Sequence, residues 1–324
     1  MHLRRTPGRT CPGHAGVTVF RRVGRPPLPG PSEIATTASA SPRSPLTVSF
    51  LGVSTLLFDD GESAILTDGF FSRPSLARTL VLPLRSDMQR IDAALHRAGI
   101  VSLDAVLCAH SHYDHALDSA AVAGRTGAVL VGGSSTGFIG RGSDLPDGRI
   151  VAVEHGETTE HGNFTVTFYE SVHSHPDRAH GKIERPLSQP ARVSAFRCGE
   201  AWSMLIEHIP SGLTSLVHSS AGFRAGLLDG RHADVVYLSI GQLGRRSHAF
   251  IEQYWRETVS AVGAGRVVLT HWDNFFRPLH RPLQALPYAF DDMTASIAVL
   301  ADCARRDGIV LELPTLWRRG DPWS

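Results

Sequence analysis

The segment VLCAHSHYDH at residues 106–115 constrains this chain more than any other feature of its sequence. A short buried strand is expected at 106–109, and His110, His112, Asp114 and His115 follow it directly as an HxHxDH pattern. Imidazole and carboxylate groups are zinc ligands. Two histidines at positions i and i+2 of an extended chain point the same way, and the turn after them brings Asp114 and His115 round to a second position. The pattern predicts a metal site at the end of a buried strand.

The alternative interpretation of this segment is a polar surface loop. A fixed pattern of four positions arises by chance in about one of several hundred such chains, which makes it fairly specific. Four ligand-type residues within six positions have no structural reason to cluster, so the metal site is favoured.

Three further histidines occupy equivalent places along the chain. His173, His218 and His271 each stand where a predicted buried strand ends. A single histidine would mean little, but strand ends that gather at one rim of a sheet are where sites form. We therefore expect all seven residues to converge.

Periodicity predicts a meander of strands at 47–52, 55–58 and 64–67, with Asp59-Asp60-Gly61 as a hairpin turn. Further strands are expected at 106–109, 128–131, 150–153, 164–168, 201–206, 214–217, 235–239 and 267–270, and helices at 86–98, 116–123, 248–262 and 291–306. Strands come first, and helices then alternate with strands in each half. This order favours an α/β fold in which two sheets pack together with helices outside.

Residues 1–44 are rich in Pro, Gly, Arg, Ser and Thr. They hold too little apolar surface to fold, so we predict a disordered tail over 1–45 and one domain over 46–324. An address tag or a basic tether is the functional alternative, and a passive tail is favoured.

Charge and cysteine content limit the partners and the compartment. The tail holds seven arginines and one acid, so with a net charge of +1 for the whole chain the remainder carries −5. A mildly acidic body is a poor match for a phosphate backbone, which favours a small-molecule substrate over nucleic acid. The four cysteines are far apart and predict a reducing, cytoplasmic setting. No apolar run approaches the ~20 residues of a membrane span, and the oligomeric state is not readable.

The chain resembles the metallo-β-lactamase fold superfamily, in the hydrolase branch that includes lactonase-like and N-acyl-ethanolamine-phospholipid phospholipase-D-like members. The resemblance runs from about Leu46 to Pro314. It rests on LGVST at 51–55, ILTDG at 65–69, HSHYDH at 110–115, His173, SLVHSSAG at 215–222 and THWDNF at 270–275. It implies a four-layer αββα sandwich of the metallo-β-lactamase type and a zinc-dependent hydrolase with one or two zinc ions per chain.

The resemblance also implies a role for each residue. One zinc ion would be held by His110, His112 and His173. The other would be held by Asp114, His115 and His271. Asp68 would orient a ligand histidine from outside the site. A metal-bound hydroxide would attack an ester, lactone, amide or phosphodiester, and Asp114 would orient it or take its proton.

One residue departs from the family pattern. The family usually has an acid that bridges both metals at the end of the strand that ends here in His218. A neutral imidazole offers one lone pair, so His218 is predicted to bind a single zinc or to leave the second site weak. Asp118 and Asp234 are the nearest other acids. We interpret both as structural because neither ends a strand in the right register.

Three other functions stay open. An iron-dependent oxidoreductase on the same fold is one, and a non-catalytic metal-binding relative is another. The third is a serine hydrolase, because Gly133–Gly137 matches GxSxG with Ser135 as nucleophile. A polar loop with a helix cap is favoured over that reading, because residues 138–170 do not predict the alternating βα context that a nucleophile elbow needs.

The pocket is expected to draw on two segments. The long loop 174–191, with His175, His180 and Arg185, is predicted to shape it. Trp272, Phe275 and Phe276 are candidates for an apolar wall, with core packing an equal alternative.

Overall fold

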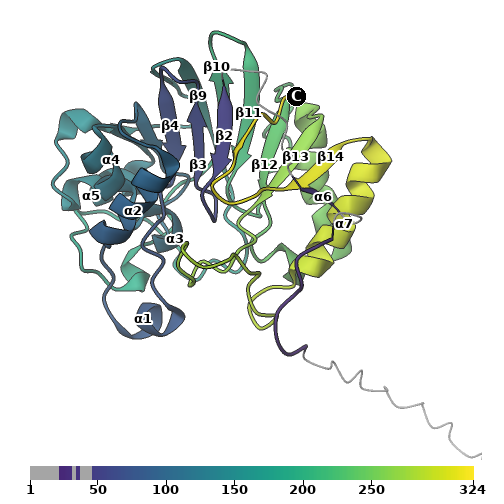
Figure 1. The fold of residues 1–324 in the computed structure, drawn as a ribbon, viewed down its shortest axis with the longest axis horizontal. Helices are drawn as coiled ribbons and strands as arrows, with labels where there is room; N and C mark the ends of the chain where they lie inside the picture. Colours follow the sequence, from purple (N-terminus) through teal and green to yellow (C-terminus); the bar gives the residue numbers. More distant parts are fainter. Residues whose placement is uncertain (1–21, 31–33, 37–45) are drawn as a thin grey trace, which may run out of the picture.

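A computed structural model of the protein describes residues 22–30, 34–36 and 46–324. Two mixed β-sheets pack against each other in the middle of the molecule, and helices cover the outer face of each (Figure 1). The rings of Phe58 and Tyr237 meet edge to face between the sheets, with centroids 5.7 Å apart. The predicted four-layer αββα sandwich is confirmed. None of the helices in the described part of the chain has the length and apolar character that a membrane crossing requires.

The seven-stranded sheet begins with the meander that the sequence predicted. Its strands, in spatial order, are β15 (Arg319–Gly320), β2 (Thr47–Phe50), β3 (Leu56–Asp59), β4 (Ala64–Thr67), β5 (Ala105–Leu107), β6 (Val129–Gly132) and β7 (Ile150–Ala152). Strands β2, β3 and β4 are antiparallel, and β4 to β7 are parallel. Because Thr67 pairs with Leu107 at the ends of two parallel strands, the residues that follow β4 and β5 share one edge of the sheet.

The eight-stranded sheet is antiparallel on one side and parallel on the other. Its strands, in spatial order, are β1 (Ala35–Thr36), β14 (Val310–Leu313), β13 (Arg266–Thr270), β12 (Val235–Ser239), β11 (Leu213–His218), β10 (Ala201–His208), β9 (Phe164–Ser171) and β8 (Thr158–His161). Both β9 and β11 are antiparallel to β10, and β11 to β13 are parallel. The carboxyl ends of β9, β11, β12 and β13 therefore lie at one edge.

Helices close both outer faces. Those beside the seven-stranded sheet include α2 (Met88–Ala98), α4 (Ser119–Thr126) and α5 (Ser134–Gly142), and α6 (His248–Thr258) and α7 (Met293–Asp307) cover the eight-stranded sheet (Figure 1). Two short helices, α1 (Leu76–Val81) and α3 (Tyr113–Ala116), lie at the edge of the sandwich. Helix α2 shows why these segments fold as they do. Asp87 caps its start, Gly99 ends it in the left-handed conformation, and Ile91 and Leu95 bury one face.

Two predicted elements differ from the structure. The helix expected at 116–123 is divided into α3 and α4, and α5 covers residues 134–142, of which 134–137 were interpreted as part of a polar loop with a helix cap. A Cβ at Gly140 would lie 2.9 Å from the side chain of Ile150 in β7. This glycine lets α5 pack closely on the sheet, and the glycines of α5 weaken the apolar period by which a helix is recognised in a sequence.

The prediction of a disordered tail over 1–45 falls largely on residues outside the described ones. It does not hold for 22–30 and 34–36, which contact the domain. Arg25 donates from Nη1 to the carbonyl of Ala285 at 2.9 Å, and β1 pairs in parallel with β14. Ile34 is 4% exposed and belongs to the main core. One apolar residue in a polar stretch is invisible to an argument from average composition.

Replacing Ile34 with Ala should therefore destabilise the domain. Deleting a buried isoleucine side chain down to alanine costs about 2 kcal/mol or more. Val23, which is 96% exposed in the same N-terminal region, offers a matched control, and Val23→Ala should change stability by no more than about 0.5 kcal/mol. Urea unfolding of the two variants checks this. Equal midpoints for both would contradict the role given to Ile34.

Candidate metal centre

Six of the seven predicted residues meet where the carboxyl ends of the strands from both sheets come together. The seven-stranded sheet leads into His110, which follows β5, and into α3, which begins directly after His112 and contains Asp114 and His115. The eight-stranded sheet provides His173 after β9 and His271 after β13. Helix α3 lies at the edge between the two halves in Figure 1. Each sheet thus carries part of the cluster.

The first group of potential ligands is His110, His112 and His173, whose ligand atoms all lie within 4.8 Å of one another. His112 Nδ1 is 3.1 Å from His173 Nε2. His173 Nδ1 lies 2.8 Å from the carbonyl oxygen of Ser174, so Nδ1 carries the proton and donates it there. The Nε2 lone pair of His173 is then free to face the group.

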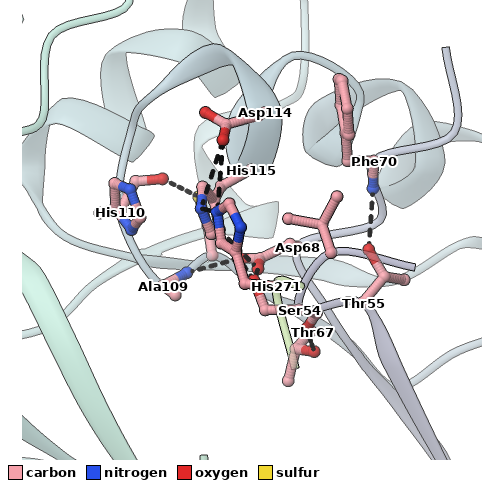
Figure 2. A network of polar contacts seen from close by, with 12 residues as sticks. Ser54, Thr55, Thr67, Asp68, Phe70, Ala109, His110, Asp114, His115 and His271 are labelled. Atoms are coloured by element: carbon pink, nitrogen blue, oxygen red, sulfur yellow. Dashed lines mark hydrogen bonds and ion pairs between the residues drawn. The ribbon is translucent and has the colours of Figure 1, made fainter. Parts of the chain in front are cut away.

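The second group is Asp114, His115 and His271, again with ligand atoms within 4.8 Å. The Nε2 atoms of His115 and His271 are 3.2 Å apart, and Asp114 Oδ2 lies 3.4 Å from His271 Nε2. His115 Nδ1 contacts Asp68 Oδ2 at 2.8 Å. Figure 2 shows Asp68 and Asp114 on opposite sides of the His115 ring. This places the proton of His115 on Nδ1 and leaves Nε2 as an acceptor.

Asp68 has the place that the family resemblance implied for it. Its Oδ1 accepts from the backbone N–H of Ala109 at 2.9 Å, and its Oδ2 accepts from the Ser54 hydroxyl at 2.8 Å (Figure 2). The residue is fully buried and has a φ of 56°, an unusual backbone conformation for an aspartate. Its carboxylate therefore joins β4, β5 and α3, and it fixes the orientation of the His115 ring.

His271 is also fixed in position by its contacts. It has a φ of 57°, and its backbone N–H donates to the carbonyl of Val53 at 2.6 Å. A Cβ at Gly241 would lie 2.7 Å from His271 Nδ1, so only glycine allows the loop after β12 to approach the ring this closely. Contacts from both sheets fix this imidazole.

Burial, together with the charge of neighbouring groups, lowers the pKa of two histidines of the first group, His110 and His173. Burial, with the neighbouring histidines, holds the pKa of His110 well below its ordinary value, and burial lowers the pKa of His173 to about 3. For Asp114, burial acts to raise the pKa, but the hydrogen bond with His271 and the nearby histidine charges hold it far below its usual range. These residues present free lone pairs and a carboxylate at neutral pH, as a cation requires.

The donor set fits a divalent cation. Two nitrogens bound to one tetrahedral zinc at ~2.0–2.1 Å stand about 3.3 Å apart, close to the 3.1 Å and 3.2 Å observed in the two groups. Both ring nitrogens of His110 are buried without a hydrogen-bond partner, which is costly unless something else binds them. All the donors are nitrogen or oxygen, a set that suits zinc and also iron.

His218 does not join either group, contrary to the prediction that it is a metal ligand. It is the last residue of β11, and its ring packs against Tyr254 of α6, on the helix-covered side of the sheet. Its Nδ1 accepts from the Ser203 hydroxyl at 2.7 Å, and its Nε2 donates to the carbonyl of Gly222 at 2.7 Å. Both nitrogens are therefore occupied by hydrogen bonds. Strand alternation turns this side chain away from the site edge.

The burial of His218 should make the free energy of unfolding depend on pH. Burial lowers the pKa of His218 to about 4, whereas an unfolded histidine titrates near its ordinary value of 6.5. Below pH 6.5 the unfolded chain therefore binds a proton that the folded protein binds only near pH 4. Stability contributed by neutral His218 is complete above pH 6.5 and is lost as the pH falls toward 4, by about 1.4 kcal/mol per pH unit.

Replacing His218 with Gln, which keeps a donor and an acceptor but does not titrate, should remove this slope. Unfolding free energies of the unchanged protein and the variant, measured between pH 4 and 7, check the expectation. Parallel pH profiles for the two proteins would be incompatible with it.

The residues after His218 face the cavity, although His218 does not. Ser219 and Ser220 line the cavity over the cluster. Asp118 has the structural role predicted for it, since its carboxylate accepts from the backbone of Phe71 and from the backbone and hydroxyl of Ser72. Asp234 likewise accepts from Thr214. The end of β11 therefore brings hydroxyls to the cavity, and neither Asp118 nor Asp234 supplies a bridging carboxylate.

A cavity of about 310 Å³ opens over the two groups. The loop predicted to shape it does so, but through Ser174, Pro176, Arg178 and Ala179, and not through His175, His180 or Arg185. Phe275 and Phe276 form part of an apolar wall, as one of the two interpretations expected, whereas Trp272 is buried in the core and stacks on Phe50. Sequence reasoning missed other lining residues that carry no motif, among them Tyr113, Phe196 and Phe290.

Ser135 is not placed as a nucleophile. The βα context that residues 138–170 were predicted to lack is present, because β6, α5 and the parallel strand β7 follow one another. Its hydroxyl is instead fully buried and accepts from the backbone N–H of Ile183 at 3.0 Å. A nucleophile elbow needs an exposed hydroxyl, which this residue does not have.

Comparisons with known proteins agree with this picture. Residues 48–189 match the family model of the metallo-beta-lactamase superfamily. No match was found among curated proteins. Among solved structures, Igni18, a novel metallo hydrolase from the hyperthermophilic archaeon Ignicoccus hospitalis, is 13% identical with a TM-score of 0.51, and the alignment covers 85% of this chain and 97% of that one.

A second solved structure is CmlA, a diiron beta-hydroxylase from Streptomyces venezuelae. It is 15% identical with a TM-score of 0.54, and the alignment covers 87% of this chain and 55% of CmlA, so this chain spans about half the length of that protein. Likeness at this level of identity concerns the fold alone, and the branch of the family stays a prediction. The fold and the matched residues confirm the resemblance, and the chain carries a domain of the metallo-beta-lactamase superfamily.

Proposed function

We propose that this protein is a zinc-dependent hydrolase of a small molecule that contains an ester, lactone or phosphodiester bond. One observation carries the proposal. Two groups of three ligand-type residues stand side by side, and each contains a pair of ring nitrogens whose separation suits two ligands of one ion. His110, His112 and His173 would hold one ion, and Asp114, His115 and His271 the other.

A bound divalent ion would supply two things here, a water whose pKa is lowered to about 7 and polarisation of the carbonyl or phosphoryl oxygen. The residues of the chain do the rest. Asp114 is ionised, and it accepts a proton from the attacking water or orients it. The apolar wall formed by Phe275 and Phe276 keeps bulk water away from the reacting atoms, which strengthens each charge interaction inside the cavity.

The cavity lining supports an uncharged or weakly anionic small molecule. Apart from the candidate metal ligands, Arg178 is the charged residue that lines it, and the serines at 219, 220 and 239 offer hydroxyls to polar substrate atoms. A cytoplasmic setting belongs to the same proposal. Cys108, Cys198 and Cys303 are buried free thiols, as a reducing compartment allows.

Metal analysis of the purified protein tests this proposal first. We expect one to two zinc equivalents per chain, and hydrolysis of at least one substrate in a panel of lactones, esters and phosphodiesters. Incubation with a chelator should abolish turnover, and added zinc should restore it. Iron in place of zinc, with oxygen consumption and no hydrolysis, would instead support an iron-dependent oxidoreductase, which the nitrogen and oxygen donor set also allows. A protein that carries no metal and hydrolyses nothing would contradict both.

A further inference from the structure

Asp177 lies beside the first group of ligands, on a segment that no sequence motif marks. It belongs to the connection between β9 and β10, and its side chain is 15% exposed. Its Oδ1 lies 3.2 Å from His112 Nε2, while His173 faces Nδ1 of the same ring at 3.1 Å. The two neighbours therefore contact opposite nitrogens of His112, and the carboxylate stands behind the ring and not on its ligand side.

The same arrangement recurs in the second group. There Asp68 contacts Nδ1 of His115 at 2.8 Å, and the opposite nitrogen faces His271. A carboxylate that accepts the second N–H of a ligand histidine fixes its tautomer and ring orientation, and makes the other nitrogen more basic. Asp177 takes the corresponding place beside His112. Its contact is an ion pair at 3.2 Å without hydrogen-bond geometry, so it places an acceptor group next to a buried Nε2 that has no hydrogen-bond partner among the described residues.

Asp177 is itself held in place, as a positioning group must be. Its Oδ1 accepts from the backbone N–H of Ala179 at 3.0 Å, and its Oδ2 lies 3.4 Å from His180 Nδ1. Cys198, which is buried, completes a third group with His112 and Asp177 whose potential ligand atoms lie within 4.8 Å of one another. The loop is thus folded so as to present this one carboxylate to His112.

Asp177 also places a negative charge beside the first group. The second group contains a carboxylate of its own, Asp114, but the first group is made of three histidines and has no carboxylate. The end of β11, where the resemblance implied a bridging acid, carries His218 followed by Ser219 and Ser220, so no negative charge comes from there. Asp177 is the carboxylate in contact with the first group, and a negative charge near a divalent ion is stabilising.

We infer that Asp177 is a positioning residue for the metal of the first group, acting through His112. The inference rests on the proposed function, since it assumes that the two groups hold metal. Ser174, Pro176 and Arg178, next to Asp177 in the chain, line the cavity. The loop that lines the cavity therefore also sets the metal affinity of the first group. A change in loop conformation alters the affinity of the first group more than that of the second.

Separate titration of the two groups tests the inference. In a His271→Ala background the second group is incomplete, and Co²⁺ binding, followed by its visible absorption, reports the first group. In a His173→Ala background it reports the second group. Adding Asp177→Ala should weaken Co²⁺ binding by about 10–100-fold in the first background, the usual cost of losing such a partner. It should leave the second background unchanged.

Two further variants sharpen the result. Glu184→Gln removes an exposed carboxylate from the same loop and should weaken neither group. Asp177→Asn keeps an acceptor of the same shape and should lose no more affinity than Asp177→Ala. Unchanged Co²⁺ affinity in Asp177→Ala, or a third bound ion in the unchanged protein that Asp177→Ala removes, would overturn the inference while leaving the proposed function intact. Absence of any bound metal in the unchanged protein would overturn both.

Discussion

Replacing His110 with Ala should remove the metal-dependent part of the protein's stability together with its activity. An ion that binds only the folded state stabilises it by about 4 kcal/mol at a free concentration 1,000 times its Kd. His110 is buried with both nitrogens unpartnered, and its ring centroid is 3.8 Å from that of His115, so its loss disturbs both groups. Without metal the variant loses packing contacts but no hydrogen bond, and it no longer buries two unpartnered nitrogens, so its change in unfolding temperature should be smaller than the zinc-induced gain that it loses.

The measurement is thermal unfolding with and without saturating zinc. The unchanged protein should gain stability on zinc addition, and His110→Ala should gain little. His96→Ala changes an exposed histidine of α2 and should behave like the unchanged protein. An equal zinc-induced gain in His110→Ala and His96→Ala would mean that the ion binds elsewhere.

The second large effect is expected from Asp273→Ala. Asp273 and Arg73 form an ion pair in which both side chains are fully buried. Arg73 also donates to the carbonyls of Asn274 and Arg277, and Asp273 accepts from the backbone N–H of Val53 at 2.8 Å. Removing the carboxylate leaves an uncompensated buried guanidinium, which costs about 3–5 kcal/mol.

This ion pair also anchors the second group of ligands. Val53, whose N–H binds Asp273, accepts the backbone N–H of His271 through its carbonyl, so the loop that carries His271 is tied to the seven-stranded sheet. Asp273→Ala should therefore weaken the Asp114, His115 and His271 group more than the other. Urea unfolding and metal titration check both effects. Asp302→Ala, which breaks an exposed ion pair with Arg305, should change stability by less than about 1 kcal/mol, and a similar small change in Asp273→Ala would contradict the expectation.

The fold was predictable from sequence where periodicity was strong. The meander β2 to β4 and the buried strands that end in the site show alternation or continuous apolar runs. The misses have physical causes. Helix α5 packs so closely on the sheet that only glycine fits at position 140. Ile34, which directly precedes β1, is buried in the core as one apolar side chain in a polar stretch. Local pattern cannot reveal a contact that is decided by a distant partner.

Some residues of the site could likewise be predicted from the sequence, and others could not. His110, His112, Asp114 and His115 could be found because they are close in sequence, and His173 and His271 because each follows a buried strand. The same rule chose His218 wrongly, since it says that a residue ends a strand but not which face its side chain takes. Asp177 lies in a loop without periodicity, and only the folded chain brings it to His112.

Each ligand group takes residues from both sheets, so an ion bound there would join the two sheets of the sandwich. Residues His112 and His173 are 61 positions apart in the chain, and His115 and His271 are 156 apart. Because the ion binds the folded state alone, it opposes any separation of the two sheets by its own binding free energy, and it leaves the unfolded chain unrestricted. The metal-loaded protein should therefore resist opening between its halves more strongly than the metal-free protein, whose halves are still joined by the shared hydrophobic core.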